Sequence, residues 1–202
     1  MSKDRDEYSW VLKVFRVALR QTDRDVMGFM ALAGYETPRS RVVGHLCMPT
    51  NRRFVPCYRR AFESYFMGFL FTFTSVDKAQ ARTIAEGVMS VLRTCDIDTY
   101  GSVMALLTDA IRSYSDDESE HAIFPLGFEG EFNLLADALE KGELEGPLTS
   151  LLERICTELD GSLSDCQILM ARIVEAFNED KALYSELLRG LGRHLAEKVK
   201  AA

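Results

Sequence analysis

The sequence predicts an all-α protein, a multi-helix bundle of about nine or ten helices. Apolar residues recur at spacings of three and four, which is the period of an amphipathic helix. No segment alternates apolar and polar residues over the length of a strand, and no Asn-Gly dipeptide marks a hairpin. Capping residues and prolines or glycines bracket the periodic segments. These observations favour a helix-hairpin-rich N-terminal module followed by acidic C-terminal helices.

The N-terminal part begins with three predicted helices. The first covers about residues 8–20. The second begins after a cap at Thr22 or Asp23 and stops before Gly34, because glycine readily ends a helix. The third takes Thr37 as its N-cap and Pro38 as its first residue, and it ends before Pro49.

Two longer helices and a shorter one complete this part. The fourth runs from about Pro56 to Phe73, and its stripe of phenylalanines at 62, 66, 69 and 73 predicts a buried face. Ser75 is the predicted cap of a fifth helix. A sixth covers about residues 98–113.

An acidic segment at residues 113–131, with one proline and two glycines, predicts a domain boundary. We therefore expect an N-terminal helical domain with a basic face over residues 1–114 and an acidic C-terminal helical domain over residues 127–202. The two could also pack as one domain. The C-terminal helices are expected at about 132–141, 144–159, 164–177 and from 180 onward.

The charge divides along the chain in the same way. The formal net charge is -7, yet residues 1–73 carry 12 Lys and Arg against 7 Asp and Glu, and the remainder carries 12 against 24. Residues 37–62 hold six arginines and no acid. Such asymmetry indicates an anionic partner for the basic part.

Composition also limits the class of protein. Five cysteines at irregular spacings do not form a disulfide framework, and the first ten residues lack the apolar core of a secretory signal. The longest apolar run, residues 65–73, is about half of the roughly 20 residues that a membrane span needs. We therefore expect reduced thiols, no membrane partner and a cytoplasmic location.

The common catalytic and cofactor patterns are missing. Phosphate-binding and dinucleotide glycine motifs and Gly-x-Ser-x-Gly are absent. Glu118 and His121 form a single Glu-x-x-His in a hydrophilic run, which favours a surface segment over a metal site. The calcium-like start at Asp96 fails because Leu107 replaces the required glutamate. We expect no catalytic residue, metal or cofactor, and the sequence favours a protein that is not an enzyme.

The stretch "MPTNRRFVPCYRR", residues 48–60, is the predicted site. Arginine pairs well with phosphate, aromatic rings can stack on bases, and helix N-termini attract anions. The candidate anion- or nucleic-acid-binding residues are Arg39, Arg41, His45, Arg52, Arg53, Tyr58, Arg59 and Arg60.

Three interpretations of these residues remain open. In the first, a non-enzymatic regulator or adaptor grips an anionic partner, nucleic acid first. One form of this interpretation is a helix-turn-helix made of the second and third predicted helices, in which the third helix would expose Arg39, Arg41 and His45. Alternatively, the arginines could pair with acidic residues, either of the chain's own C-terminal half or of a partner protein or second copy. In the latter case the acidic half could act as a mimic of nucleic acid. An enzyme with an unfamiliar site is the third.

Residues 11–73 resemble the uncharacterised bacterial YehS-like family. The matching positions lie in "LAGYE", at Leu32, Ala33, Tyr35 and Glu36, and in the following long helix, at Cys57, Phe66, Gly68 and Phe69. The resemblance implies an all-helical fold and brings no activity or functional residue. In that family the loop before the long helix is acidic and rich in lysine, whereas here it is "PTNRRFVP".

Overall fold

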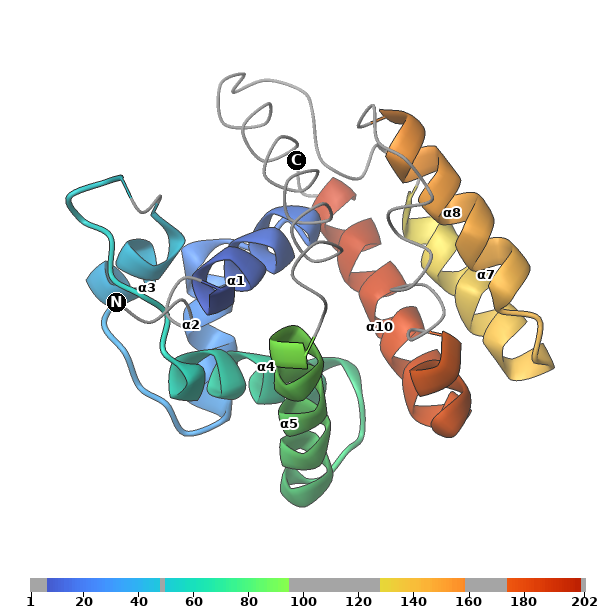
Figure 1. Ribbon diagram of the computed structural model, residues 1–202, viewed down its shortest axis with the longest axis horizontal. Coiled ribbons are helices and arrows are strands. Elements are labelled where there is room, and N and C mark those ends of the chain that lie inside the picture. The colour runs from blue at the N-terminus through green and yellow to red at the C-terminus, as the bar shows by residue number, and fades with distance from the viewer. Residues whose placement is uncertain (1–6, 48–49, 95–127, 159–173, 201–202) are drawn as a thin grey trace. The chain divides into compact units, whose positions relative to one another are not determined.

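The computed structural model describes residues 7–47, 50–94, 128–158 and 174–200. The regular elements within those ranges are all α-helices, which confirms the predicted all-α class (Figure 1). The chain divides into two compact units, residues 1–93 and 94–202. The predicted sixth helix and most of the predicted boundary segment lie outside the described residues, as does most of the helix expected at 164–177.

Five helices belong to the N-terminal unit. Their bounds are α1 Glu7–Ala18, α2 Asp23–Leu32, α3 Arg39–Leu46, α4 Arg59–Phe73 and α5 Lys78–Thr94. Helix α2 packs mainly against α4, and both α1 and α3 contact this pair. Of the consecutive helices in this unit, α2 and α3 contact each other.

Helix α2 forms where the sequence predicts it because both of its ends are satisfied. The Thr22 hydroxyl accepts a hydrogen bond from the Asp25 backbone N–H, and the Asp25 carboxylate accepts one from the Thr22 N–H at 2.6 Å. This reciprocal pair is a capping box. At the other end Gly34 has a φ of 81°, and the Tyr35 N–H donates to the Met30 carbonyl. That left-handed residue ends the helix.

Helices α2 and α4 cross so closely that only glycine fits at Gly68. A Cβ atom added there would overlap the Phe29 carbonyl oxygen and lie 2.8 Å from the Phe29 Cα. Since these neighbours are backbone atoms, no side-chain movement could relieve the clash. The absence of a side chain at Gly68 therefore sets the distance between the two helices.

Aromatic rings fill the core of this unit. The predicted stripe on α4 is buried, at Phe62, Phe66, Phe69 and Phe73, and Tyr65 lies beside it. Phe29 packs edge-on against Tyr65, Phe69 and Phe73, with ring centroids 5.8–6.0 Å apart. Such T-shaped pairs are favourable beyond the area they bury. The prediction that this stripe is core is confirmed.

Several helix starts differ from the prediction. Pro38, with an extended ψ of 148°, is the N-cap of α3, so that helix begins at Arg39 and Thr37 does not cap it. Asp77 rather than Ser75 caps α5, because its carboxylate accepts from the backbone N–H groups of Ala79 and Gln80. Sequence reasoning chose the first available capping residue, whereas the fold uses one that lies closer to the helix.

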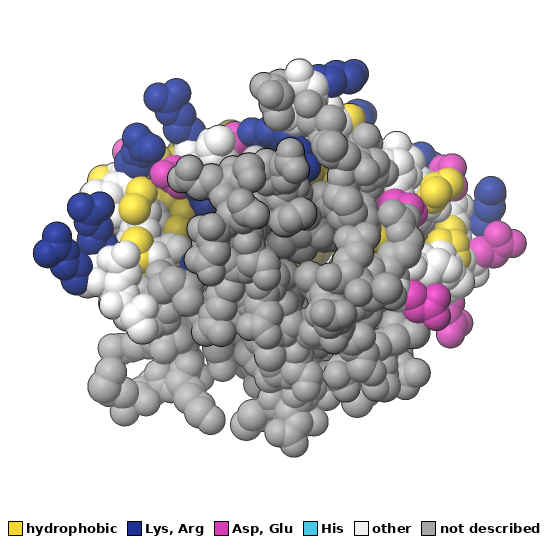
Figure 2. All heavy atoms as spheres, turned by 90° about the horizontal axis from the view of Figure 1, so that it is seen from above, with side chains coloured by type: hydrophobic (Ala, Val, Ile, Leu, Met, Phe, Trp, Pro, Cys, Tyr) yellow, Lys and Arg dark blue, Asp and Glu magenta, His cyan; other side chains and the backbone are white. Residues whose placement is uncertain are grey.

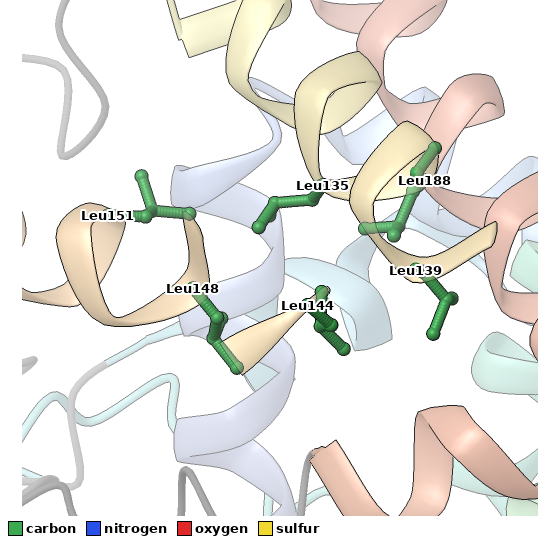
Figure 3. Packing of buried hydrophobic residues seen from close by; sticks show 7 residues of the cluster. Leu135, Leu139, Leu144, Leu148, Leu151 and Leu188 are labelled. Atoms are coloured by element: carbon green, nitrogen blue, oxygen red, sulfur yellow. The ribbon is translucent and has the colours of Figure 1, made fainter. Parts of the chain in front are cut away.

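The C-terminal unit contains α7 Phe128–Lys141, α8 Glu145–Glu158 and α10 Lys181–Lys200, and residues 174–179 are also helical. Helix α7 begins four residues before its predicted start, and Gly130 lies within its first turn. Six leucines from α7, α8, α10 and the α7–α8 turn form its core (Figure 3): Leu135, Leu139, Leu144, Leu148, Leu151 and Leu188.

A polar contact ties α10 to α7. The Arg189 guanidinium lies 2.7 Å from the Asp137 carboxylate and 3.0 Å from that of Glu140. These two hydrogen bonds raise the pKa of Arg189.

Among the helices of the described ranges, none combines the length and the apolar character that crossing a bilayer requires.

Candidate anion-binding surface

The candidate residues lie on α3, on the following loop and on the first turn of α4. Helix α3 is short, and Cys47 ends it. Asn51 then starts a tight turn, since its side-chain oxygen accepts from the Arg53 N–H at 2.9 Å and its carbonyl from the Phe54 N–H at 2.8 Å. This side-chain-to-backbone bonding is typical of asparagine in turns. The turn places Arg52 and Arg53 at its exposed tip.

After the turn, the loop is bonded back onto α3. The Val55 N–H donates to the Gly44 carbonyl at 3.0 Å, and the Val55 carbonyl lies 2.9 Å from Nδ1 of His45. A Cβ on Gly44 would lie 2.8 Å from a Val55 methyl group. The loop that carries the two arginines therefore has a fixed attachment to α3.

His45 is buried, so the prediction that it lies exposed on a recognition helix is wrong. Its side chain faces the loop, and only 1% of the residue is accessible to solvent. Burial lowers the pKa of His45, and the nearby Arg41 charge lowers it further. Neutral His45 donates from Nδ1 to Val55, and its buried Nε2 has no hydrogen-bond partner among the described atoms. His45 is thus a support for the loop and not a surface contact.

Helix α4 begins at Arg59, three residues later than predicted. Pro56 looked like a first helical residue, but the chain stays extended as far as Tyr58, the N-cap. The Cys57 N–H instead donates to the Ser9 hydroxyl of α1 at 2.7 Å. Burial raises the pKa of the Cys57 thiol to about 12. Cys57 is therefore an anchor with an unreactive thiol.

The six candidate arginines fall into two groups. Arg39 pairs with Asp23 at 3.5 Å, and the Arg60 guanidinium lies over the Tyr35 ring, 5.9 Å from its centroid. The other four are exposed and have no carboxylate within 4.0 Å among the residues that the structure describes. They are Arg41, Arg52, Arg53 and Arg59. Figure 2 shows Lys and Arg side chains standing out from the N-terminal unit, with apolar side chains between them.

Helix α4 also lacks the negative charge that usually favours a helix start. Its first turn contains no acidic residue, and Tyr58 provides no side-chain cap. A cation there opposes the helix dipole by about 0.3–1 kcal/mol when exposed. Arg59 and Arg60 therefore occupy positions that a bound anion would stabilise.

Sequence reasoning missed the residues that hold this surface together. Asn51 could have been found, because asparagine before a polar pair often starts a turn. Ser9, Tyr35 and Val55 contact the loop or its arginines from distant positions, and no local pattern marks them. Asp23 was assigned only a capping role, yet it pairs with both Arg16 and Arg39.

The other chemical candidates add little. Glu118, His121 and the segment 96–107 lie outside the described residues. Within the described ranges, no group of three or more His, Cys, Asp or Glu residues could hold a metal ion. No protein-family model, curated protein or solved structure matches the chain. The YehS-like resemblance stays a prediction.

Proposed function

We propose that this chain is a non-enzymatic regulatory or adaptor protein that binds an anionic partner, nucleic acid first. The main support for this proposal is a set of four exposed arginines that have no carboxylate partner in the described part of the chain: Arg41, Arg52, Arg53 and Arg59. A cytoplasmic location belongs to the same proposal and rests on the cysteine pattern.

Geometry supports phosphate as the anion that is bound. Arginine presents a planar fork of donors that fits two phosphate oxygens, and four such groups, in the first turn of α3, on the loop and in the first turn of α4, could follow a backbone. The attachment of the loop through Val55 and Cys57 limits the ordering that binding would require. A repeating polyanion therefore fits this surface better than a single small ion.

The test compares two variants that lose equal positive charge. Arg41→Ala/Arg52→Ala/Arg53→Ala/Arg59→Ala changes the surface, and Lys78→Ala/Lys141→Ala/Arg193→Ala/Lys200→Ala removes exposed cations elsewhere. Binding of labelled nucleic acid is measured by fluorescence anisotropy over a series of salt concentrations. We expect the first variant to lose most of the affinity and to lower the salt slope by up to about 4, since each phosphate contact contributes about one.

The control variant should keep the slope and most of the affinity of the parent. Equal losses in the two variants would mean that only net charge matters and would refute the assigned surface. Absence of binding by the parent chain at low salt would refute the proposal as a whole.

A second candidate function is a protein–protein or self-association module. It is favoured by the exposed acids of the C-terminal unit, visible as magenta side chains in Figure 2, which could receive the arginines of another copy. Sedimentation at low and high salt tests this candidate. Self-association that falls with salt, and that the arginine variant abolishes, would support it over nucleic-acid binding.

A further inference from the structure

Helix α3 offers little surface for reading a duplex groove. Its exposed residues, Arg39, Ser40 and Arg41, make up a single turn, and Arg39 is already paired with Asp23. The next turn is covered, because Gly44, His45 and Leu46 are buried and the loop is bonded to the first two of these. A helix that enters a major groove presents side chains along its length. The arrangement around α3 therefore gives no support to groove reading.

The exposed residues of the segment between α3 and α4, with the first two residues of α4, form two short runs, 50–53 and 58–60. Together they contain four arginines, no acid and one aromatic side chain, that of Tyr58. Tyr58 is 54% exposed, and it is one of three large apolar side chains that reach the surface of the described residues. An exposed aromatic ring therefore comes directly before two exposed arginines in the chain.

The backbone of Tyr58 is held from both sides. Cys57, directly before it, is fully buried and hydrogen-bonded to Ser9. The Tyr58 carbonyl accepts from the N–H groups of Ala61 and Phe62 in the first turn of α4. Its main chain is therefore fixed while its side chain stays open. A ring presented in this way loses little freedom when a flat partner stacks on it.

We propose that the polyanion recognised at this surface is single-stranded nucleic acid, with a base stacked on Tyr58 and the strand's phosphates paired with Arg52, Arg53 and Arg59. In a duplex each base face is covered by its neighbours, whereas a single strand can offer a base to an aromatic side chain. Interleaved cations and an exposed ring are the combination that such strands require. This inference rests on the proposed function and names its substrate class.

The experiment uses the full chain and two probes of the same length. One is a labelled oligothymidylate of about 16 nucleotides, near the upper end of common site sizes, and the other is the same strand annealed to its complement. Binding is followed by anisotropy at low salt. We expect the single strand to bind at least about ten-fold more tightly than the duplex.

Variants of Tyr58 then isolate stacking from charge. Tyr58→Ala should weaken binding of the single strand by about five-fold to one hundred-fold, while Tyr58→Phe should keep it, because stacking needs the ring and not the hydroxyl. Leu32→Ala is the matched control, since Leu32 is 61% exposed in the same unit and lies outside the two runs. Neither Tyr58→Ala nor the control should change duplex binding. Circular dichroism verifies that each variant is folded.

Failure of this inference can be distinguished from failure of the proposed function. Equal affinity for both probes, or a Tyr58→Ala variant that binds the single strand like the parent, would overturn the single-strand assignment and leave nucleic-acid binding standing. If neither probe binds at low salt, both proposals fall.

Discussion

The two units differ in the residue types that they bury and in those that they expose. The N-terminal unit packs aromatic rings around a close helix crossing and exposes arginines, whereas the C-terminal unit packs leucines and exposes acids (Figures 2 and 3). Rings are rigid, and the crossing at Gly68 leaves no room for adjustment. Leucine side chains have several rotamers and can repack. We infer that the N-terminal unit gains a fixed geometry, which would serve the proposed surface by holding its arginines at a constant spacing.

The largest expected effect is Gly68→Ala. Because the new Cβ would overlap the Phe29 backbone, α2 and α4 must separate, and we expect a loss of more than about 4 kcal/mol in the free energy of unfolding of the N-terminal unit. Amide hydrogen exchange should show lost protection in α2 and α4. Gly87→Ala in α5 is the control, since open space surrounds it, and it should stabilise by about 0.5–1 kcal/mol. A stable Gly68→Ala protein would contradict the close crossing.

Leu139→Ala tests the other core. Leu139 is fully buried among leucines of α7 and its neighbours, so truncation should cost about 2–5 kcal/mol. Protection should fall in α7, α8 and α10 and persist in α2 and α4. Leu134 lies on the same helix but is 59% exposed, and Leu134→Ala should change stability by less than about 0.5 kcal/mol. Loss of protection in both units would mean that they unfold as one.

We expect His45 to make the N-terminal unit sensitive to acid. Its pKa is lowered in the folded state, so the unfolded chain takes up the proton first as pH falls. The stability that neutral His45 contributes should therefore be present above about pH 6.5, its ordinary pKa, and should be lost as pH falls toward the folded value. Denaturant unfolding at several pH values measures this loss. In His45→Asn, which can still donate to Val55, that part of the pH dependence should disappear.

The smallest expected effects compare one cap in each unit. The Asp77 carboxylate accepts from two backbone N–H groups at the start of α5, whereas that of Asp180 accepts from the Leu183 N–H at the start of α10. Asp77→Ala and Asp180→Ala should each cost about 0.5–2 kcal/mol, with the larger loss at Asp77. Thermal unfolding measures both. A larger loss at Asp180 would show that α10 depends more on its start than its single bond suggests.

Local signals were sufficient for part of this fold. Helix α2 has a capping box at one end and a left-handed glycine at the other, and both lie within its own few residues. The stripe on α4 has a period that identifies a buried face without knowledge of its partner. Such features are set by neighbours in the chain, so a single sequence reveals them.

The site was harder to predict because distant residues decide it. The arginines at 52, 53 and 59 are exposed as expected. His45 was misplaced because its burial depends on Val55, ten residues later, returning to α3. The start of α4 was misplaced because Cys57 bonds to Ser9, 48 positions away. Rules based on residue spacing along the chain cannot predict such long-range contacts.

The crossing at Gly68 also restricts which chains could be relatives of this one. A sequence can exchange most aromatic residues of the N-terminal core for other large apolar residues and still fill the space, but a side chain at position 68 would collide with main-chain atoms that every residue type shares. Mutation elsewhere cannot compensate for that collision without moving a helix. We therefore expect glycine at this position in any protein that keeps the same arrangement of α2 and α4, even after the surrounding sequence has diverged. The pairing of this glycine with Phe29 of α2 is thus a better marker of a shared helix arrangement than the arginines themselves.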